Sequence, residues 1–160
     1  RIVGWALEDH LRTELVQTAF RKAIWTRAPG RDLIHHSDRG CQYASDDFRR
    51  ELEVLGVTCS MSRKANCWDN AVAERFFASL KTEQVRKTTY DHLEHARRDV
   101  FEYIELYYNR KRRHQALGYL TPEECENEFW LERRKKQRKL EHVKNTMGTR
   151  KTITSTVYKT

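Results

Sequence analysis

The sequence predicts a layered α/β domain, and three observations lead to that expectation. Short apolar, β-rich runs alternate with amphipathic segments in the order strand, helix, strand, helix, strand, helix. The length of 160 residues suits a single domain. Although only 38% of the residues are hydrophobic, 11% are aromatic, and such large rings bury enough area for a core. No apolar run approaches the roughly 18 residues that a membrane span needs, so we expect no membrane association.

The first third of the chain predicts a strand, a helix and a second strand. Residues 1–7, RIVGWAL, are rich in β-formers. Residues 8–25 carry apolar side chains at helical spacing, with Asp9 placed to cap that helix. After the break at Pro29 and Gly30, residues 32–38 (DLIHHSD) predict a short strand that stops at the turn RGCQY.

The middle of the chain continues this alternation. Ser45 predicts the cap of a helix that Gly56 closes, and residues 57–62 (VTCSMS) predict the next strand. Residues 63–68 predict a loop, and a helix starts at Asp69 and runs to about residue 83. A longer helix follows, whose apolar stripe comprises Leu93, Ala96, Val100, Ile104 and Tyr107.

The positive charge is concentrated at the end of the chain. Residues 126–160 hold ten Lys or Arg and four Glu, whereas residues 1–125 hold 21 basic and 19 acidic residues. The sequence therefore predicts a main domain over 1–125 and a basic, partly disordered extension over 126–160. We expect a solvated helix around ERRKKQRK (132–139) followed by disorder, and such a run attracts nucleic acid without sequence preference.

The four cysteines predict neither a zinc site nor a disulfide framework. No CxxC pair is present, and no His and Cys stand at zinc-finger spacing. We therefore expect reduced thiols in a cytoplasmic protein.

Two carboxylates stand out by position. Asp38 ends an apolar strand and precedes a turn with a glycine, which leaves its carboxylate open to a cleft. Glu74 lies inside a helix on which Asn70, Glu74 and Lys81 share one face. A carboxylate supplies a hard oxygen for Mg²⁺, and a lysine meets a phosphate, so this pattern suits a metal-and-phosphate site. By residue type alone, a turn-forming Asp38 and a solvated Glu74 explain the pattern better than a metal site does.

Three strings resemble one family closely: HSDRGCQY (36–43), SMSRKANCWDNAVAERFFASLKTE (60–83) and YNRKRRHQALGYLTPEE (108–124). They are similar to the integrase-type catalytic core of bacterial insertion-sequence transposases, relatives of retroviral integrases. The resemblance covers residues 1 to about 125. It implies an RNase H-like fold, a mixed sheet flanked by helices in three layers, and an Asp–Asp–Glu triad that holds two Mg²⁺ or Mn²⁺ ions.

The resemblance also implies roles for single residues. Asp38 matches the second acid of the triad and Glu74 the third, with 35 residues between them. Lys81 matches a position that contacts transposon-end DNA. Asn70, in the string Asp-Asn-Ala, and the string that holds Arg112 and His114 match family positions as well.

The chain departs from the family pattern at its start. The resemblance puts the first aspartate on a strand before the segment that corresponds to residues 1–7, so we expect this chain to lack that acid and the first strands of the sheet. Asp9, at a strand-to-helix junction, and Asp32, which precedes a strand, do not replace it. We expect little or no strand transfer by the 160 residues alone, because a missing ligand misplaces the nucleophile.

The residues around the two acids have structural explanations beside functional ones. His35 and His36 point to opposite faces of a strand, so at most one faces the metals, and each suits a packing or ligand-supporting role. Arg63 and Lys64, in the loop before the helix of Glu74, could line a DNA channel. The cluster from Arg110 to His114 suits either a charged helix end or phosphate contact.

The resemblance thus implies a DNA transposition enzyme: metal-dependent cleavage at transposon ends, followed by strand transfer into target DNA. Its expected partners are DNA and further copies of the chain, in the cytoplasm and associated with the nucleoid. Two alternatives remain open. One is an RNase H-like nuclease that cuts but does not join, and the other is an inactive transposase remnant that only binds DNA through its basic tail.

Overall fold

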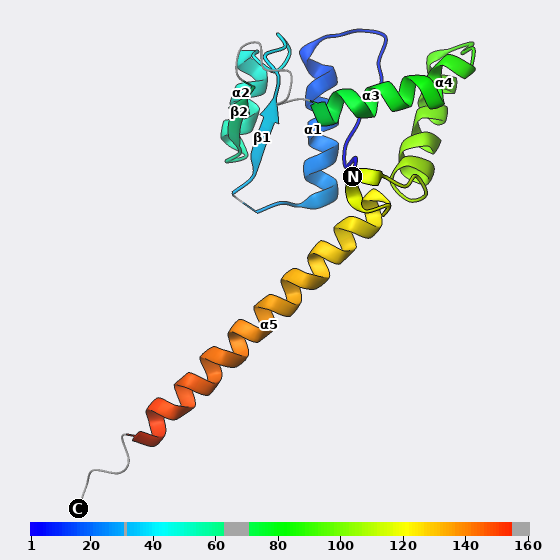
Figure 1. The fold of residues 1–160 in the computed structure, drawn as a ribbon. Coiled ribbons are helices and arrows are strands. Elements are labelled where there is room, and N and C mark those ends of the chain that lie inside the picture. The colour runs from blue at the N-terminus through cyan, green and yellow to red at the C-terminus, as the bar shows by residue number, and fades with distance from the viewer. Residues whose placement is uncertain (31, 63–70, 155–160) are drawn as a thin grey trace, which may run out of the picture. The chain divides into compact units, whose positions relative to one another are not determined.

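A computed structural model describes residues 1–30, 32–62 and 71–154, with side chains described as far as Lys144 (Figure 1). The chain divides into two compact units, one of Ile2–Tyr107 and one of Arg1 with Tyr108–Thr160. The domain boundary expected at residue 125 stays a prediction. Within the described residues, each helix is too short or too polar to cross a membrane.

The first unit contains most of the regular structure. Its elements are α1 (Thr13–Arg27), β1 (Ile34–Ser37), α2 (Asp46–Val54), β2 (Thr58–Met61), α3 (Ala71–Glu83), the 3₁₀ turn η2 (Val85–Lys87), α4 (Leu93–Phe101) and the π-helix η3 (Glu102–Tyr108), whose last residue belongs to the second unit.

In the described part of the chain, the sheet consists of β1 and β2, which pair in parallel with Ile34 opposite Thr58 and Ser37 opposite Met61. Parallel strands need a crossover, and α2 supplies it. The predicted ends of α2 are confirmed. The Ser45 hydroxyl accepts the Phe48 N–H at 3.3 Å, and Gly56 has a φ of 66°, which favours glycine.

Helices α1 and α2 pack together around an aromatic core. Phe20 of α1 and Phe48 of α2 meet edge to face at 5.5 Å, and Leu52 and Val57 complete the buried cluster. His35 of β1 lies within the same ring system, 5.4 Å from Phe20 and 5.2 Å from Phe48 between ring centroids. These contacts place both helices on the side of the sheet to which His35 points.

The two neighbouring histidines lie on opposite faces of β1, as predicted. His35 packs in the core, and its Nδ1 is buried without a hydrogen-bond partner among the described residues. His36 is exposed and bonds to Ser60 Oγ at 2.9 Å and to Ser62 Oγ at 3.3 Å. His35 is therefore a packing residue, while His36 ties β1 to the end of β2.

The predicted first strand is wrong, because residues 1–7 form no ladder with any described segment. The segment instead packs on α1, where a Cβ added to Gly4 would lie 2.3 Å from the Ala19 carbonyl oxygen and 2.7 Å from Ala23 Cβ. Only a residue without a side chain allows this approach. Farther along, Arg97 donates to the Leu7 carbonyl at 3.0 Å, so α4 holds the same segment.

The predicted cap of the first helix is wrong as well. The N-cap of α1 is Arg12, whose side chain makes no capping hydrogen bond, and the helix begins at Thr13. Asp9 lies in the bend that precedes it. A side chain caps only the amides one turn away, and Asp9 is too far along the chain to reach them.

The predicted helices over 69–83 and 93–107 are present, with changes at their ends. The described part of the first begins at Ala71, and the second passes from α4 into the π-helix η3 at Glu102. Asp99 joins these helices by accepting hydrogen bonds at 2.5 Å from both Gln84 and Tyr90. Tyr103 is buried and donates its hydroxyl to Glu83 at 2.8 Å.

The second unit contains η4 (Gln115–Leu117) and the long helix α5 (Pro122–Thr154). A capping box starts α5. The Thr121 N–H donates to Glu124 Oε2 at 2.8 Å, and the Glu124 N–H donates to Thr121 Oγ1 at 3.2 Å. Pro122 at the first helical position costs no hydrogen bond. The helix expected around residues 132–139 is present and extends to Thr154, into the stretch for which the sequence predicted disorder.

The sheet and its helices agree with an α/β class, while the mixed sheet and the three-layer arrangement stay predictions. Among the described cysteines, Cys41, Cys59 and Cys125 are free thiols, as expected, and Cys67 lies outside the described residues.

Replacing His35 by Phe should make the melting temperature less dependent on pH. Burial, and secondly the neighbouring His36, lower the pKa of His35 from its ordinary value. The unfolded chain then binds more protons below about pH 6.5, so His35 lowers stability as the pH falls through that value. Melting temperatures at about pH 7.5 and about pH 5.5 measure the effect. The control is His142→Gln, which removes an exposed histidine, and an unchanged pH slope in His35→Phe would contradict this account.

Candidate functional site

Asp38 is the first residue after β1, and backbone contacts fix the position of this strand end. Ser62, just beyond β2, donates its N–H to the Ser37 carbonyl at 2.8 Å and its hydroxyl to the same oxygen at 3.2 Å. Arg39 donates from Nε to the Ser62 carbonyl at 3.0 Å. Because Ser37 and Ser62 are buried, the chain leaves the sheet at one defined point.

The turn after Asp38 engages one of its two carboxylate oxygens. Oδ1 accepts the Gly40 N–H at 2.8 Å, which is an Asx-type turn. A Cβ at Gly40 would lie 3.0 Å from this oxygen, so glycine keeps the turn tight. Within the described residues, no partner is present for Oδ2. Asp38 is half-buried and keeps one oxygen for a ligand.

Tyr43 is a neighbour of Asp38 to which the sequence analysis assigned no role. Burial raises the pKa of its hydroxyl, and the Asp38 carboxylate raises it further. The ring also contacts Phe48 and His35, with centroids 6.1 and 6.0 Å away. Tyr43 is therefore a neutral phenol that joins the Asp38 turn to the core. The sequence feature that could have indicated this role is the position of Tyr43 at the end of the string HSDRGCQY.

Glu74 lies in the first turn of α3, where the helix dipole favours an acid. It is exposed, and so is Lys81, seven residues later on the same face. Phe76 and Leu80 are buried, and they anchor the opposite side of the helix. The structure thus confirms that Glu74 and Lys81 share a solvent-facing surface, and Asn70 lies outside the described residues.

The first unit contains both predicted metal ligands on separate elements. Among the described residues, no hydrogen bond or ion pair joins Asp38 to Glu74. Three possible ligand atoms lie within 4.8 Å of one another at Glu8, Asp9 and His10, a group that includes neither predicted ligand. Arg97 already pairs with Glu8, so that group has a structural partner.

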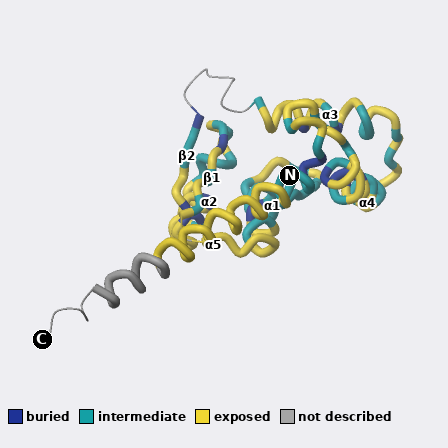
Figure 2. Tube along the Cα trace, turned by 60° about the horizontal axis from the view of Figure 1, so that its bottom comes forward, coloured by how far each residue is buried: buried dark blue, intermediate teal, exposed yellow. Residues whose placement is uncertain are grey.

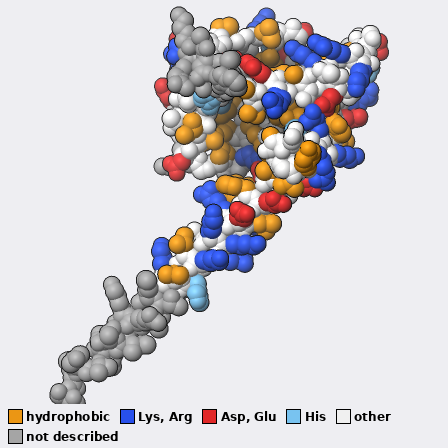
Figure 3. All heavy atoms as spheres, in the orientation of Figure 1, with side chains coloured by type: hydrophobic (Ala, Val, Ile, Leu, Met, Phe, Trp, Pro, Cys, Tyr) orange, Lys and Arg blue, Asp and Glu red, His pale blue; other side chains and the backbone are white. Residues whose placement is uncertain are grey.

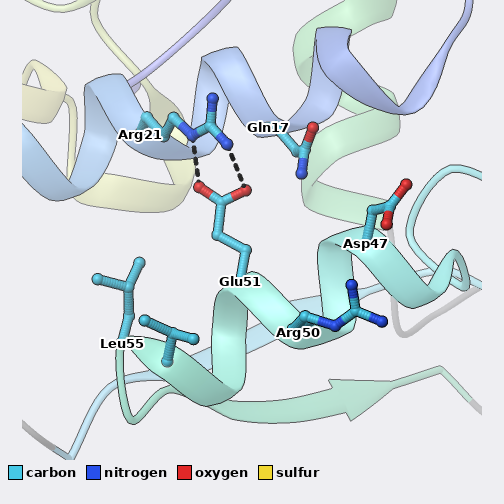
Figure 4. A pocket seen from close by; sticks show the side chains of 7 residues that line it. Gln17, Arg21, Asp47, Arg50, Glu51 and Leu55 are labelled. Atoms are coloured by element: carbon cyan, nitrogen blue, oxygen red, sulfur yellow. Dashed lines mark hydrogen bonds and ion pairs between the residues drawn. The ribbon is translucent and has the colours of Figure 1, made fainter.

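A pocket in the first unit has neither Asp38 nor Glu74 in its lining. It lies between α1 and α2, where Arg21 meets Glu51 through two hydrogen bonds of 2.6 and 3.1 Å (Figure 4). Its lining consists of Gln17, Arg21, Asp47, Arg50, Glu51, Val54 and Leu55. The hydrogen bonds that Arg21 donates to Glu51, and then the charge of Glu51, raise the pKa of Arg21, so the guanidinium stays positively charged. We assign no chemistry to this pocket.

Arg112 and His114 come together in the second unit. The Tyr108 ring meets His114 edge to face at 4.9 Å, and Arg112 lies over the same ring at 5.6 Å. Arg112 Nη1 lies 3.3 Å from His114 Nδ1. Aromatic contact thus holds both basic side chains near one another.

The other arginines of this cluster pair with the start of α5. Arg113 lies 3.2 Å from Glu124, and Arg110 lies 3.7 Å from Glu123. The backbone hydrogen bond from Thr121, followed by the charge of Arg113, lowers the pKa of Glu124. Part of the basic cluster therefore secures the helix start, whereas Arg112 and His114 lie against the Tyr108 ring. Arg63 and Lys64 lie outside the described residues.

Comparison with known proteins shows which family the segments around Asp38, Glu74 and Arg112 resemble. Two family models match, both described as an integrase core domain, one over residues 1–67 and the other over residues 55–122. Together they reach from the start of the chain to the first residue of α5. Integrase core domains have an RNase H-like α/β fold, with which the parallel strands and their crossover helix agree.

Several curated relatives are similar over most of this chain. The transposase for insertion sequence element IS904 of Lactococcus lactis is 38% identical over 79% of this chain and 50% of its own length. The transposase InsF for insertion sequence IS3A of Escherichia coli is 41% identical over 79% and 44%. An IS600 protein of Shigella sonnei, described as an uncharacterized 31 kDa protein, is 42% identical over 76% and 44%. The chain spans about half the length of these relatives.

Replacing Asp38 by Asn should leave stability nearly unchanged, whereas Asp38→Ala should lower it. Asn keeps an oxygen that accepts the Gly40 N–H, and Ala removes that acceptor. The lost hydrogen bond costs about 0.5–1.5 kcal/mol of unfolding free energy. Urea unfolding of the wild type and both variants measures the difference. Equal stability of Asp38→Ala and wild type would show that the turn does not depend on this bond.

Proposed function

This chain belongs to the integrase core domain family, and from that premise we propose that it takes part in DNA transposition. The proposed chemistry is metal-dependent cleavage of phosphodiester bonds at the ends of a mobile element, followed by joining of those ends to target DNA. The proposed substrates are element ends and target DNA, and the proposed place of action is the nucleoid.

The observation that carries this proposal is the state of Asp38 at the end of β1. Its position is fixed by the bonds between Ser37 and Ser62, one oxygen is held by Gly40, and the other has no partner among the described residues. Glu74 likewise has no ion pair in that part of the chain, and its side chain is exposed. Two hard carboxylate oxygen donors with free coordination capacity suit Mg²⁺ or Mn²⁺.

We assign the metal-binding role to Asp38 and Glu74. Two divalent ions, when bound, would activate the attacking oxygen and stabilise the leaving oxygen of an in-line displacement at phosphorus. The rigid strand end at Asp38 would hold its ligand oxygen in place, and the helical backbone of α3 would do the same for Glu74. A rigid support matters because small errors in position cost large factors in rate.

The proposed DNA contacts surround these acids in the sequence. Lys81 projects an ammonium from the same helix face as Glu74, where it can meet a phosphate of the bound strand. Asn70, Arg63 and Lys64 are proposed to line the path of the DNA between β2 and α3. In the second unit, Arg112 and His114 are proposed to contact the DNA backbone as a paired group.

The proposed multimer follows from the reaction. Two element ends must be joined to one target, and a single site handles one strand at a time. We therefore propose that copies of the chain associate when they bind paired ends.

Loss of either carboxylate should weaken metal binding. Titration of the full chain with Mn²⁺, followed by electron paramagnetic resonance of the free ion, should show a site that Asp38→Asn and Glu74→Gln weaken by about tenfold or more. Both substitutions keep side-chain size and remove charge. The matched control is Glu53→Gln, an exposed carboxylate on α2. Wild-type Mn²⁺ affinity in Asp38→Asn would remove this residue from the proposed site.

Strand joining distinguishes the proposed function from its alternatives. Protein expressed from the complete reading frame is incubated with a pre-cut duplex bearing a 3′-hydroxyl, a target plasmid and Mg²⁺. We expect joined product, and we expect Asp38→Asn or Glu74→Gln to reduce it by about a hundredfold or more. Cutting without joining would indicate an RNase H-like nuclease. DNA binding with neither cutting nor joining would indicate a catalytically inactive DNA-binding protein.

A further inference from the structure

All of the long helix α5 except its first residue, Pro122, is outside the part of the chain that the integrase core models match. From Asn127 to Lys144, every residue of α5 is exposed (Figure 2). Proteins seldom maintain a helix of this length in water without a partner, because isolated helices gain little stability from propensity alone. The composition of its surface indicates which partner it fits.

Residues 133–139 form what we call the basic segment. Six of its seven side chains are Lys or Arg, and Figure 3 shows such side chains along the visible face of the helix. Its members are Arg133, Arg134, Lys135, Lys136, Arg138 and Lys139. Within the described residues, Lys135, Lys136, Arg138 and Lys139 have no carboxylate partner. By contrast, the acids at the start of α5 already pair with Arg110 and Arg113.

This concentration of charge is unfavourable in the free protein. Arg134 and Arg138 stand four residues apart, as do Lys135 and Lys139, so like charges are neighbours on the helix surface. Such pairs destabilise a helix by a few tenths of a kcal/mol each. A polyanion would remove the repulsion and stabilise the same helix.

The distribution of charge around the axis favours a groove over a flat surface. Consecutive residues turn by about 100°, so the four cations from Arg133 to Lys136 point in all directions around the helix. The major groove of DNA admits an α-helix and has phosphates along both walls. A helix with cations on all sides can therefore meet both backbones, whereas a flat anionic surface would reach only one side.

The basic segment does not fit two other partners. Over residues 132–139 the helix has no apolar side chain, so it lacks the apolar face that insertion into a bilayer requires. A second copy packed along this stretch would bring the cations of both helices together. The apolar residues of α5, such as Phe129 and Leu140, lie on either side of the basic segment and are separated by it.

We propose that α5 is a DNA-binding helix whose basic segment lies against the phosphate backbones of duplex DNA. The choice of DNA among polyanions rests on the proposed function. The site is separate from Asp38 and Glu74, and it binds without reading sequence, because Lys and Arg contacts to phosphate carry no base information. It would hold the protein on DNA independently of cleavage and joining.

The test measures binding of the full chain to a fluorescent duplex of about 30 base pairs and arbitrary sequence, over about 50 to 200 mM salt. The variant carries Lys135→Gln, Lys136→Gln, Arg138→Gln and Lys139→Gln, and glutamine preserves helix propensity. The matched control carries Arg49→Gln, Arg50→Gln, Arg86→Gln and Lys87→Gln, which remove four exposed cations from the first unit. Circular dichroism confirms that both variants are folded.

We expect the α5 variant to bind about tenfold or more weakly at about 100 mM salt, and the logarithmic salt slope to fall by about two to four. The control should change affinity by about twofold or less, and helix content of the wild type should rise on DNA binding. Equal losses in both variants would overturn the proposal, since net charge alone would then explain binding. Unchanged binding by the α5 variant would overturn it as well.

Two further measurements exclude the other partners. Tighter binding to vesicles of anionic lipid than to the duplex would overturn the proposal. Self-association that disappears in the α5 variant, while its DNA affinity is unchanged, would overturn it as well.

The joining assay separates this inference from the proposed function. If DNA binding depends on α5 but no joining occurs, the proposed function is overturned and the DNA-binding site on α5 is supported. If joining occurs but the α5 variant binds DNA as tightly as the wild type, the proposed function is supported and the site on α5 is overturned.

Discussion

The packing of Phe48 is the constraint on which the first unit depends. This residue is 1% exposed, and its ring contacts Phe20 of α1, His35 of β1 and Tyr43 of the Asp38 turn. One side chain thus joins α1, β1 and the turn that connects β1 to α2. This contact and the bonds between Ser37 and Ser62 together set the direction in which β1 ends, and with it the position of Asp38. A two-stranded sheet has too few ladder bonds to hold that position alone.

Features that depend on neighbouring residues were predictable from the sequence. The cap at Ser45 and the left-handed Gly56 follow from local turn chemistry, and the opposite faces of His35 and His36 follow from strand geometry. Features that depend on distant partners were not. Residues 1–7 have the composition of a strand, but a strand requires a neighbour, and Gly4 lets the segment approach α1 instead.

The candidate site divides in the same way. The positions of Asp38 at a strand end and of Glu74 on an exposed helix face were predictable, because each depends on one element. The proximity of Tyr43 to Asp38 required the folded turn. The residues from Arg110 to His114 make two different kinds of contact, which the sequence did not distinguish. Arg110 and Arg113 pair with Glu123 and Glu124, whereas Arg112 lies beside His114.

The capping box at Thr121 has a consequence for how the chain responds to mutation. It starts α5 together with the ion pairs that Arg110 and Arg113 make to the first turn, and the exposed residues after it rely on their own propensity for helix. Folding of the first unit is therefore insensitive to what stands at those positions. Any restriction on them during evolution would then come from the proposed DNA contact and not from the core, so this stretch can change its affinity for DNA without a cost in folding.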